Sequence, residues 1–88
     1  MREKIDQEVS VVSYYSAKKK QTVPYRLHWQ NKDYALGPVS YYHSYMEGQD
    51  KQHIFELVDK EKTLWFRLRL DSGNLHWTLE AIHDGLAT

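Results

Sequence analysis

The sequence predicts a mainly β protein, a small antiparallel barrel or strongly curved sheet of about six strands. Three observations predict it: several short runs are rich in β-branched and aromatic residues, apolar and polar side chains alternate along them, and turn-forming residues separate them. Alternation is what a strand with one buried face requires, because successive side chains point to opposite faces of a sheet. Closure or strong curvature is favoured because a flat sheet leaves its edges unpaired.

The first predicted strand covers residues 8–15, where valines and tyrosines mix with serines. Residues 16–22, which contain Lys18, Lys19 and Lys20, are predicted to form a solvated loop.

Residues 25–36 are predicted to form a hairpin. Pairing of Trp29 with Tyr34 and of Leu27 with Leu36 keeps one face of the hairpin apolar.

The turn of this hairpin is expected near Asn31 and Lys32, because asparagine tolerates the positive φ that a tight turn demands. Pro24 fits the first position of a strand. Residues 37–38, Gly-Pro, are expected to end or bend the second strand.

Residues 39–52 have two interpretations. The segment 39–45 either continues a strand or makes a helical turn, and residues 46–52 are polar and expected to form a mobile loop.

The C-terminal third gives the clearest pattern, a three-stranded meander over residues 53–58, 64–70 and 75–82, with turns near residues 60–61 and 72–73 and a frayed tail from His83. The register that keeps one face apolar pairs Leu57 with Leu64, Phe55 with Phe66, Leu70 with Leu75, Leu68 with Trp77, Phe66 with Leu79, and Leu64 with Ala81. The expected core is Leu27, Trp29, Tyr34, Leu36, Phe55, Leu57, Phe66, Leu68, Leu70, Trp77 and Leu79.

Length and composition narrow the classes of function. The 88 residues are expected to form a single β-rich domain, residues 1–88, with 12 basic and 12 acidic side chains and no cysteine. A net charge of zero argues against a dedicated duplex-DNA binder. No run is long and apolar enough for a membrane helix and no export signal is visible, so we expect a cytoplasmic protein without membrane contact.

Neither a metal site nor a catalytic site is predicted. The five histidines form no short ligand motif and no cysteine supports them, so no metal or cofactor is expected. In the predicted register Glu56 and Glu80 flank Trp65 with Arg67 diagonal to each, which suits a cross-strand charge ladder better than an acid/base pair. No nucleophile elbow is present, so the chain is not expected to be an enzyme.

Three groups of side chains are candidates for binding. Trp65, Arg67 and Arg69 share the outer face of a predicted central strand, where an exposed tryptophan beside arginines would grip a protein or stack on a nucleobase. The alternative is that residues 39–52 or a second subunit cover this face. The other two groups are the tyrosines Tyr41, Tyr42 and Tyr45, and the lysines Lys18, Lys19 and Lys20, which would meet phosphates or be merely solvated.

Two sequence blocks carry a resemblance. Residues 24–36 run from a proline through an aromatic residue and a tryptophan to a turn and a tyrosine, and residues 66–71 and 77–79 form a second block that ends near Asp84. Over about residues 8–84, with a poorly matched middle loop, the chain resembles a family of small bacterial proteins known as a domain of unknown function. The Gly-Arg turn of that family is Asn31-Lys32 here, so a functional turn arginine is not carried over. Some family members lie near DNA-repair genes.

These observations predict a non-enzymatic binding domain. The first hypothesis is protein binding or self-association through the aromatic outer face. The second is a single-stranded nucleic-acid binding module, which the resemblance would link to DNA repair. The third is a small ligand-binding protein with a pocket built from tyrosines. Zero net charge favours the first hypothesis over the second.

Overall fold

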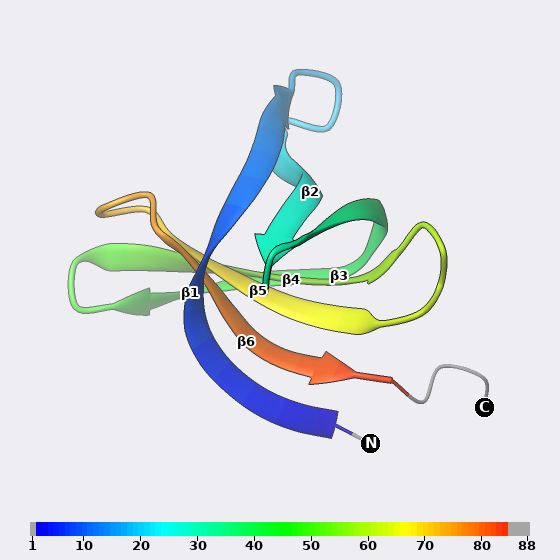
Figure 1. The fold of residues 1–88 in the computed structure, drawn as a ribbon. Coiled ribbons are helices and arrows are strands. Elements are labelled where there is room, and N and C mark those ends of the chain that lie inside the picture. Colours follow the sequence, from blue (N-terminus) through cyan, green and yellow to red (C-terminus); the bar gives the residue numbers. More distant parts are fainter. Residues whose placement is uncertain (1, 85–88) are drawn as a thin grey trace.

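The computed structural model describes residues 2–84, and these residues form one antiparallel sheet of six strands. The strands are β1 (Arg2–Ser16), β2 (Gln21–Trp29), β3 (Lys32–Glu47), β4 (Asp50–Asp59), β5 (Trp65–Asp71) and β6 (Trp77–His83). Each strand pairs with the next, and β1 also pairs with β6, so the sheet closes into a ring (Figure 1). The predicted fold class is therefore confirmed. No helix among the described residues is long and apolar enough to cross a membrane.

Strand β1 divides its pairing between two neighbours. Its first half, up to Val9, pairs with β6, and its second half, from Ser10, pairs with β2. The register with β6 shifts between Lys4 and Gln7, where Asp6 has a φ of 56°. Because β1 curves from one partner to the other, the hairpin that it forms with β2 extends away from the end of the ring where β1 begins and β6 ends (Figure 1).

The contact between β2 and β3 is short and lies at one end of the ring. Four residue pairs join them, from Arg26 with Ala35 to Trp29 with Lys32. From Leu36 onward β3 pairs only with β4. The β1–β2 and β3–β4 hairpins therefore diverge from this contact, and the ring opens between them.

Gly37 lies where β3 leaves β2. A Cβ atom there would lie 2.8 Å from the carbonyl oxygen of Val58 on the neighbouring strand, so the close approach requires glycine. The β3–β4 register shifts at the same point, between Leu36 and Val39. The expected bend at residues 37–38 is confirmed, and the strand continues beyond it.

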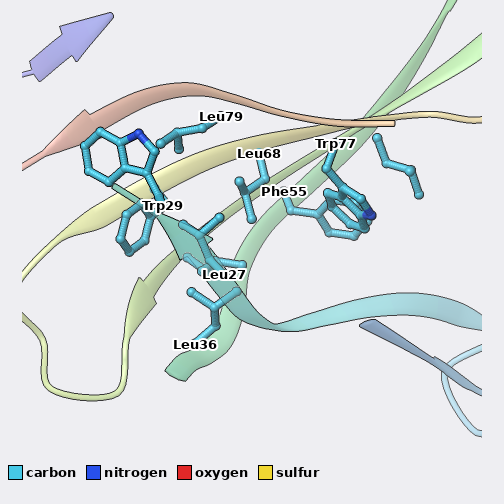
Figure 2. Close-up of a cluster of buried hydrophobic side chains, with 10 residues drawn as sticks. Leu27, Trp29, Leu36, Phe55, Leu68, Trp77 and Leu79 are labelled. Atoms are coloured by element: carbon cyan, nitrogen blue, oxygen red, sulfur yellow. The ribbon is translucent and has the colours of Figure 1, made fainter. Parts of the chain in front are cut away.

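The core fills the closed part of the ring, and inward-facing side chains of β2 to β6 form it (Figure 2). Phe55 packs against Trp77 with ring centroids 5.5 Å apart. All of the expected core residues except Tyr34 are buried, and Tyr34 is half-buried against the cluster, with its ring edge-on to Phe66. Ala81 and Ile54 are buried as well; Ile54 lies on the opposite face of β4 from Phe55.

The predicted registers are wrong in all three hairpins, by two residues in β2–β3, in β4–β5 and in the part of β5–β6 nearest its turn. Beyond a register shift between Arg67 and Leu68, Phe66 pairs with Ile82, three residues from its predicted partner Leu79. Leu27 pairs with Tyr34, Leu57 with Phe66, and Leu68 with Leu79, so each residue keeps the expected face but has a different partner. The face is preserved because strand side chains repeat every two residues, and a shift of two leaves the pattern unchanged.

Turn chemistry explains each shift. In the β2–β3 hairpin the turn is Gln30 and Asn31, one residue earlier than expected. Leu27 therefore pairs with Tyr34 and not with Leu36. In the β4–β5 hairpin, the Asp59 carboxylate accepts hydrogen bonds from Thr63 Oγ1 and from the backbone N–H groups of Thr63 and Leu64, so Leu64 lies in the turn.

The β5–β6 connection is wider for a similar reason. The Gly73 N–H donates to Asp71 Oδ1, and the Leu75 N–H donates to the Asp71 carbonyl. Leu75 has a φ of 62° and is exposed, so the predicted pairing of Leu70 with Leu75 is wrong, and Leu70 pairs with Trp77.

Three further expectations need correction. Residues 46–52 are not a mobile loop, because β3 runs to Glu47 and β4 starts at Asp50, with Gly48 in the turn at a φ of 63°. The segment 39–45 is a strand and not a helical turn. Pro24 is the fourth residue of β2, beside the register shift in β1, and is not its first residue. The tail was expected to fray from His83, but His83 is the last residue of β6 and pairs with Arg2 and Trp65. The part of this expectation beyond Asp84 lies outside the described residues.

The β2–β3 turn yields a stability prediction. Gln30 and Asn31 both have positive φ, 54° and 59°, as a two-residue hairpin turn of the primed type requires. Asn31→Gly is expected to leave the free energy of unfolding unchanged or slightly higher, and Asn31→Val to lower it by about 1–2 kcal/mol. Urea denaturation measures both, with Ala35→Val on the adjacent strand as the control. Equal stability of the glycine and valine variants would contradict the positive φ.

Candidate functional site

The outer face of β5 carries Trp65, Arg67 and Arg69, as predicted, but this face is largely occupied by other side chains. The Arg2 guanidinium lies 5.0 Å from the centre of the Trp65 ring, and His83 meets that ring edge-on. Residues 39–52 do not cover this face, because they belong to the β3–β4 hairpin, which lies beside β5 in the sheet. Trp65 is therefore half-buried between the first and last described strands.

The arginines of this face form a charge ladder. Arg67 donates to Glu56 Oε2 at 2.7 Å and to Glu80 Oε1 at 2.8 Å, and Arg69 donates to Glu80 Oε2 at 2.9 Å. The hydrogen bond to Glu80, together with the two nearby carboxylates, raises the pKa of Arg67. The predicted ladder is confirmed, but Arg67 and not Trp65 lies between the two glutamates, because the β4–β5 register is shifted by two and the β5–β6 register shifts beside Glu80.

The three lysines lie in the turn between β1 and β2 and are exposed. The backbone N–H of Lys19 donates to Ser16 Oγ. Lys20 has a φ of 54° and lines a cavity together with Tyr42 and His53. The structure therefore separates the three lysines, since Lys20 lines one cavity and Lys19 lines a smaller one of about 190 Å³ together with Tyr41 and Tyr42.

The three tyrosines also separate. Tyr41 and Tyr45 are exposed on the outer face of β3, on either side of His43, with ring centroids 5.3 and 6.2 Å from that imidazole. Tyr42 points to the inner face, where its hydroxyl is hydrogen-bonded to His53 Nδ1 at 2.6 Å. Tyr42 also contacts the ring of Phe55 in the core.

The open part of the ring, called the mouth below, contains a cavity of about 300 Å³. The β1–β2 hairpin forms one wall, and strands β3, β4 and β5 form the other. The lining residues are Tyr15, Lys20, Gln21, Thr22, Tyr42, Lys51, His53, Phe55 and Leu70. This volume is at the lower end of the range of about 300–1,000 Å³ that is common for small-molecule sites.

The mouth has an apolar floor and a polar rim. Phe55 and Leu70 are core residues with exposed fractions of 1% and 8%. Lys20 and Lys51 are exposed at the rim, and the Tyr42–His53 pair lies between the rim and the floor. Burial, and secondarily the charge of Lys51, lowers the pKa of His53, so its imidazole is neutral at pH 7.

A larger and more open hollow of about 700 Å³ lies on the outside, between the first half of β1 and strands β5 and β6. Its walls include Arg67, Arg69 and Glu80, which are already joined in the charge ladder, and Lys4, which lies 4.0 Å from Asp6. The cations of this hollow are largely matched by anions of the chain, so it is a weaker candidate for a ligand than the mouth.

Within residues 2–84, no three histidine, aspartate or glutamate side chains gather closely enough to hold a metal ion. His28 pairs with Asp33 at 2.7 Å on the outer face, and His76 lies 3.7 Å from Glu8. His53, which the alternation predicts on the inner face, is the histidine that lines the mouth.

Most residues of the mouth were not among the predicted site residues; only Lys20 and Tyr42 were. His53 had a usable signal, since a titratable side chain at an inward position of a strand is unexpected. Lys51 and Thr22 had none, because they meet only when the two hairpins face each other across the opening.

Comparisons with protein-family models, curated proteins and solved structures give no match to this chain. The family resemblance therefore stays a prediction, and the proposal for function rests on the site itself.

The charge ladder yields a prediction about stability. Arg67→Gln removes the cation that Glu56 and Glu80 share, and both carboxylates are about four-fifths buried. We expect the free energy of unfolding to fall by about 1–3 kcal/mol, because two charge-assisted hydrogen bonds are lost and two carboxylates face each other across the strand. Urea denaturation measures this loss.

The control is Arg26→Gln, which removes the same charge from an exposed position on β2. If both variants were equally stable, the ladder would contribute no more than an isolated surface charge does.

Proposed function

We propose that this protein is a small-molecule binding domain that holds an amphipathic ligand in the mouth of its ring, without catalysing a reaction on it. The observation that carries the proposal is the cavity of about 300 Å³, which is partly open and in which an apolar floor meets a polar rim. An apolar site with a few converging polar groups is the usual character of a ligand pocket, and the mouth of a β-barrel is one of its usual positions.

The packing of the ring supports the proposal. Trp29 and Leu27 fill the closed end, where β2 and β3 are paired. At the open end Phe55 and Leu70 belong to the core and also line the cavity. A ligand there would extend the core by packing against these two side chains.

The lining of the mouth favours binding over catalysis. The Tyr42–His53 pair is the only hydrogen-bonded pair of titratable groups among its lining residues, and neither a carboxylate nor a serine lies beside it in the cavity. A general base that acts on a nucleophile needs such a partner to orient it.

The other two hypotheses receive less support. Trp65 lies beneath Arg2, and the arginines beside it are bonded to glutamates, so phosphates would compete with ion pairs that already exist. Tyr41 and Tyr45 do leave an exposed aromatic surface for association. Protein association and single-stranded nucleic-acid binding remain predictions.

A titration with simple amphiphiles tests the proposed function. Octanoate and 1-octanol are added separately to the ¹⁵N-labelled chain, and amide chemical shifts are followed. At least one of the two is expected to shift the signals of Thr22, His53 and Leu70, because these residues lie on opposite walls of the mouth.

Thr22→Trp is the blocking variant, since the larger side chain would occupy the cavity, and it is expected to abolish these shifts. Ala35→Trp adds the same ring at an exposed position of β3 and is expected to leave them intact. The proposal fails if neither compound shifts the mouth signals, or if the blocking variant binds as well as the control.

A further inference from the structure

We propose that the ligand of the mouth is an amphipathic anion, with a negatively charged head between Lys20 and Lys51 and an apolar tail against Phe55 and Leu70. This inference rests on the proposed function and names the chemical class of its ligand.

The charges at the rim have one sign. The two lysines come from different hairpins, and no aspartate or glutamate is among the residues that line the cavity. Among residues 2–84 neither lysine forms an ion pair, whereas Arg67, Arg69 and Lys4 each do. A negative head would neutralise both ammonium groups, and a cationic head would be repelled by both.

Along β4 the wall of the cavity changes from polar to apolar. Lys51, His53 and Phe55 occupy alternate positions, so they follow one another along the same face of the strand. Lys51 is exposed, His53 is half-buried and Phe55 is buried. The strand from Lys51 to Phe55 is about 13 Å long, which is close to the length of a short-chain amphiphile.

His53 gives this site a dependence on pH. The imidazole faces the Tyr42 hydroxyl from β3, the Lys51 ammonium on β4, and Lys20 and Tyr15 from the β1–β2 hairpin, while β5 contributes the uncharged Leu70. In the free protein, burial and Lys51 hold the pKa of His53 below its ordinary value. A bound anion would raise that pKa, so binding takes up a proton and tightens as the pH falls.

The test compares two ligands of equal chain length, octanoate and 1-octanol, by NMR titration of the mouth signals. At neutral pH octanoate is expected to bind about threefold to tenfold more tightly, which is the effect of partly exposed charge pairs. From about pH 8 to about pH 6 the affinity for octanoate is expected to rise and that for octanol to stay constant.

The decisive variant is Lys20→Gln combined with Lys51→Gln. It is expected to lower the affinity for octanoate to that for octanol without changing the affinity for octanol. The matched control, Lys18→Gln combined with Lys60→Gln, removes the same charge from two exposed turn positions that do not line the cavity, and it should keep the preference.

The outcomes separate the two proposals. If octanol binds in the mouth as tightly as octanoate, or if the decisive variant keeps the preference, the inference about an anion is overturned and the proposed function stands. If neither compound binds in the mouth, both proposals fail. Inorganic phosphate is a further arm, since charge without a tail should bind weakly, and tight binding of phosphate would contradict the role of the apolar floor.

Discussion

The pairing of the first half of β1 with β6 is the contact on which the rest of the structure depends. Every other strand pair joins neighbours in sequence through a turn, whereas this pair joins the first strand to the last, from Arg2 beside His83 to Val9 beside Trp77. Without it, the six strands would be an open meander with two free edges, and the inward side chains would cover one face of an exposed sheet. Closure makes that face an interior.

The same strand also creates the opening. Because β1 leaves β6 after Val9 and pairs with β2 from Ser10, its hairpin with β2 is carried over the interior. At the other side of the opening, Gly37 lets β3 turn away from β2 toward β4. The mouth is thus a consequence of two strands that change partners, and its lining comes from hairpins that are not neighbours in the sequence.

Much of the fold follows from alternation alone. The faces of β4, β5 and β6 were predictable, because the inward apolar residues of each strand, such as Phe55, Leu68 and Leu79, stand at alternate positions. A shift of two residues does not alter a face. The registers were not predictable, because they depend on the turns. Asp59 extends one turn by binding the backbone after it. Gln30 shortens another by adopting a positive φ that is uncommon for its residue type.

The site was predictable only in part. The tyrosines were recognised as a group, but alternation sends Tyr42 inward to His53 and leaves Tyr41 and Tyr45 outside, a division that needs residues 39–45 to be a strand. The lysines were likewise recognised together, and the position of Lys20 at the rim depends on how far the β1–β2 hairpin reaches. Contacts between distant hairpins leave no pattern in a single sequence.

Closure of the ring by β1 and β6 is the central claim, and solution NMR tests it most directly. We expect cross-strand nuclear Overhauser effects between the backbones of Glu3 and Ile82 and of Val9 and Trp77, with slow hydrogen exchange for the paired amides of these strands. If these effects were absent and residues 2–9 exchanged as fast as an unfolded chain, the ring would be open, and neither the enclosed core nor the mouth would exist as described.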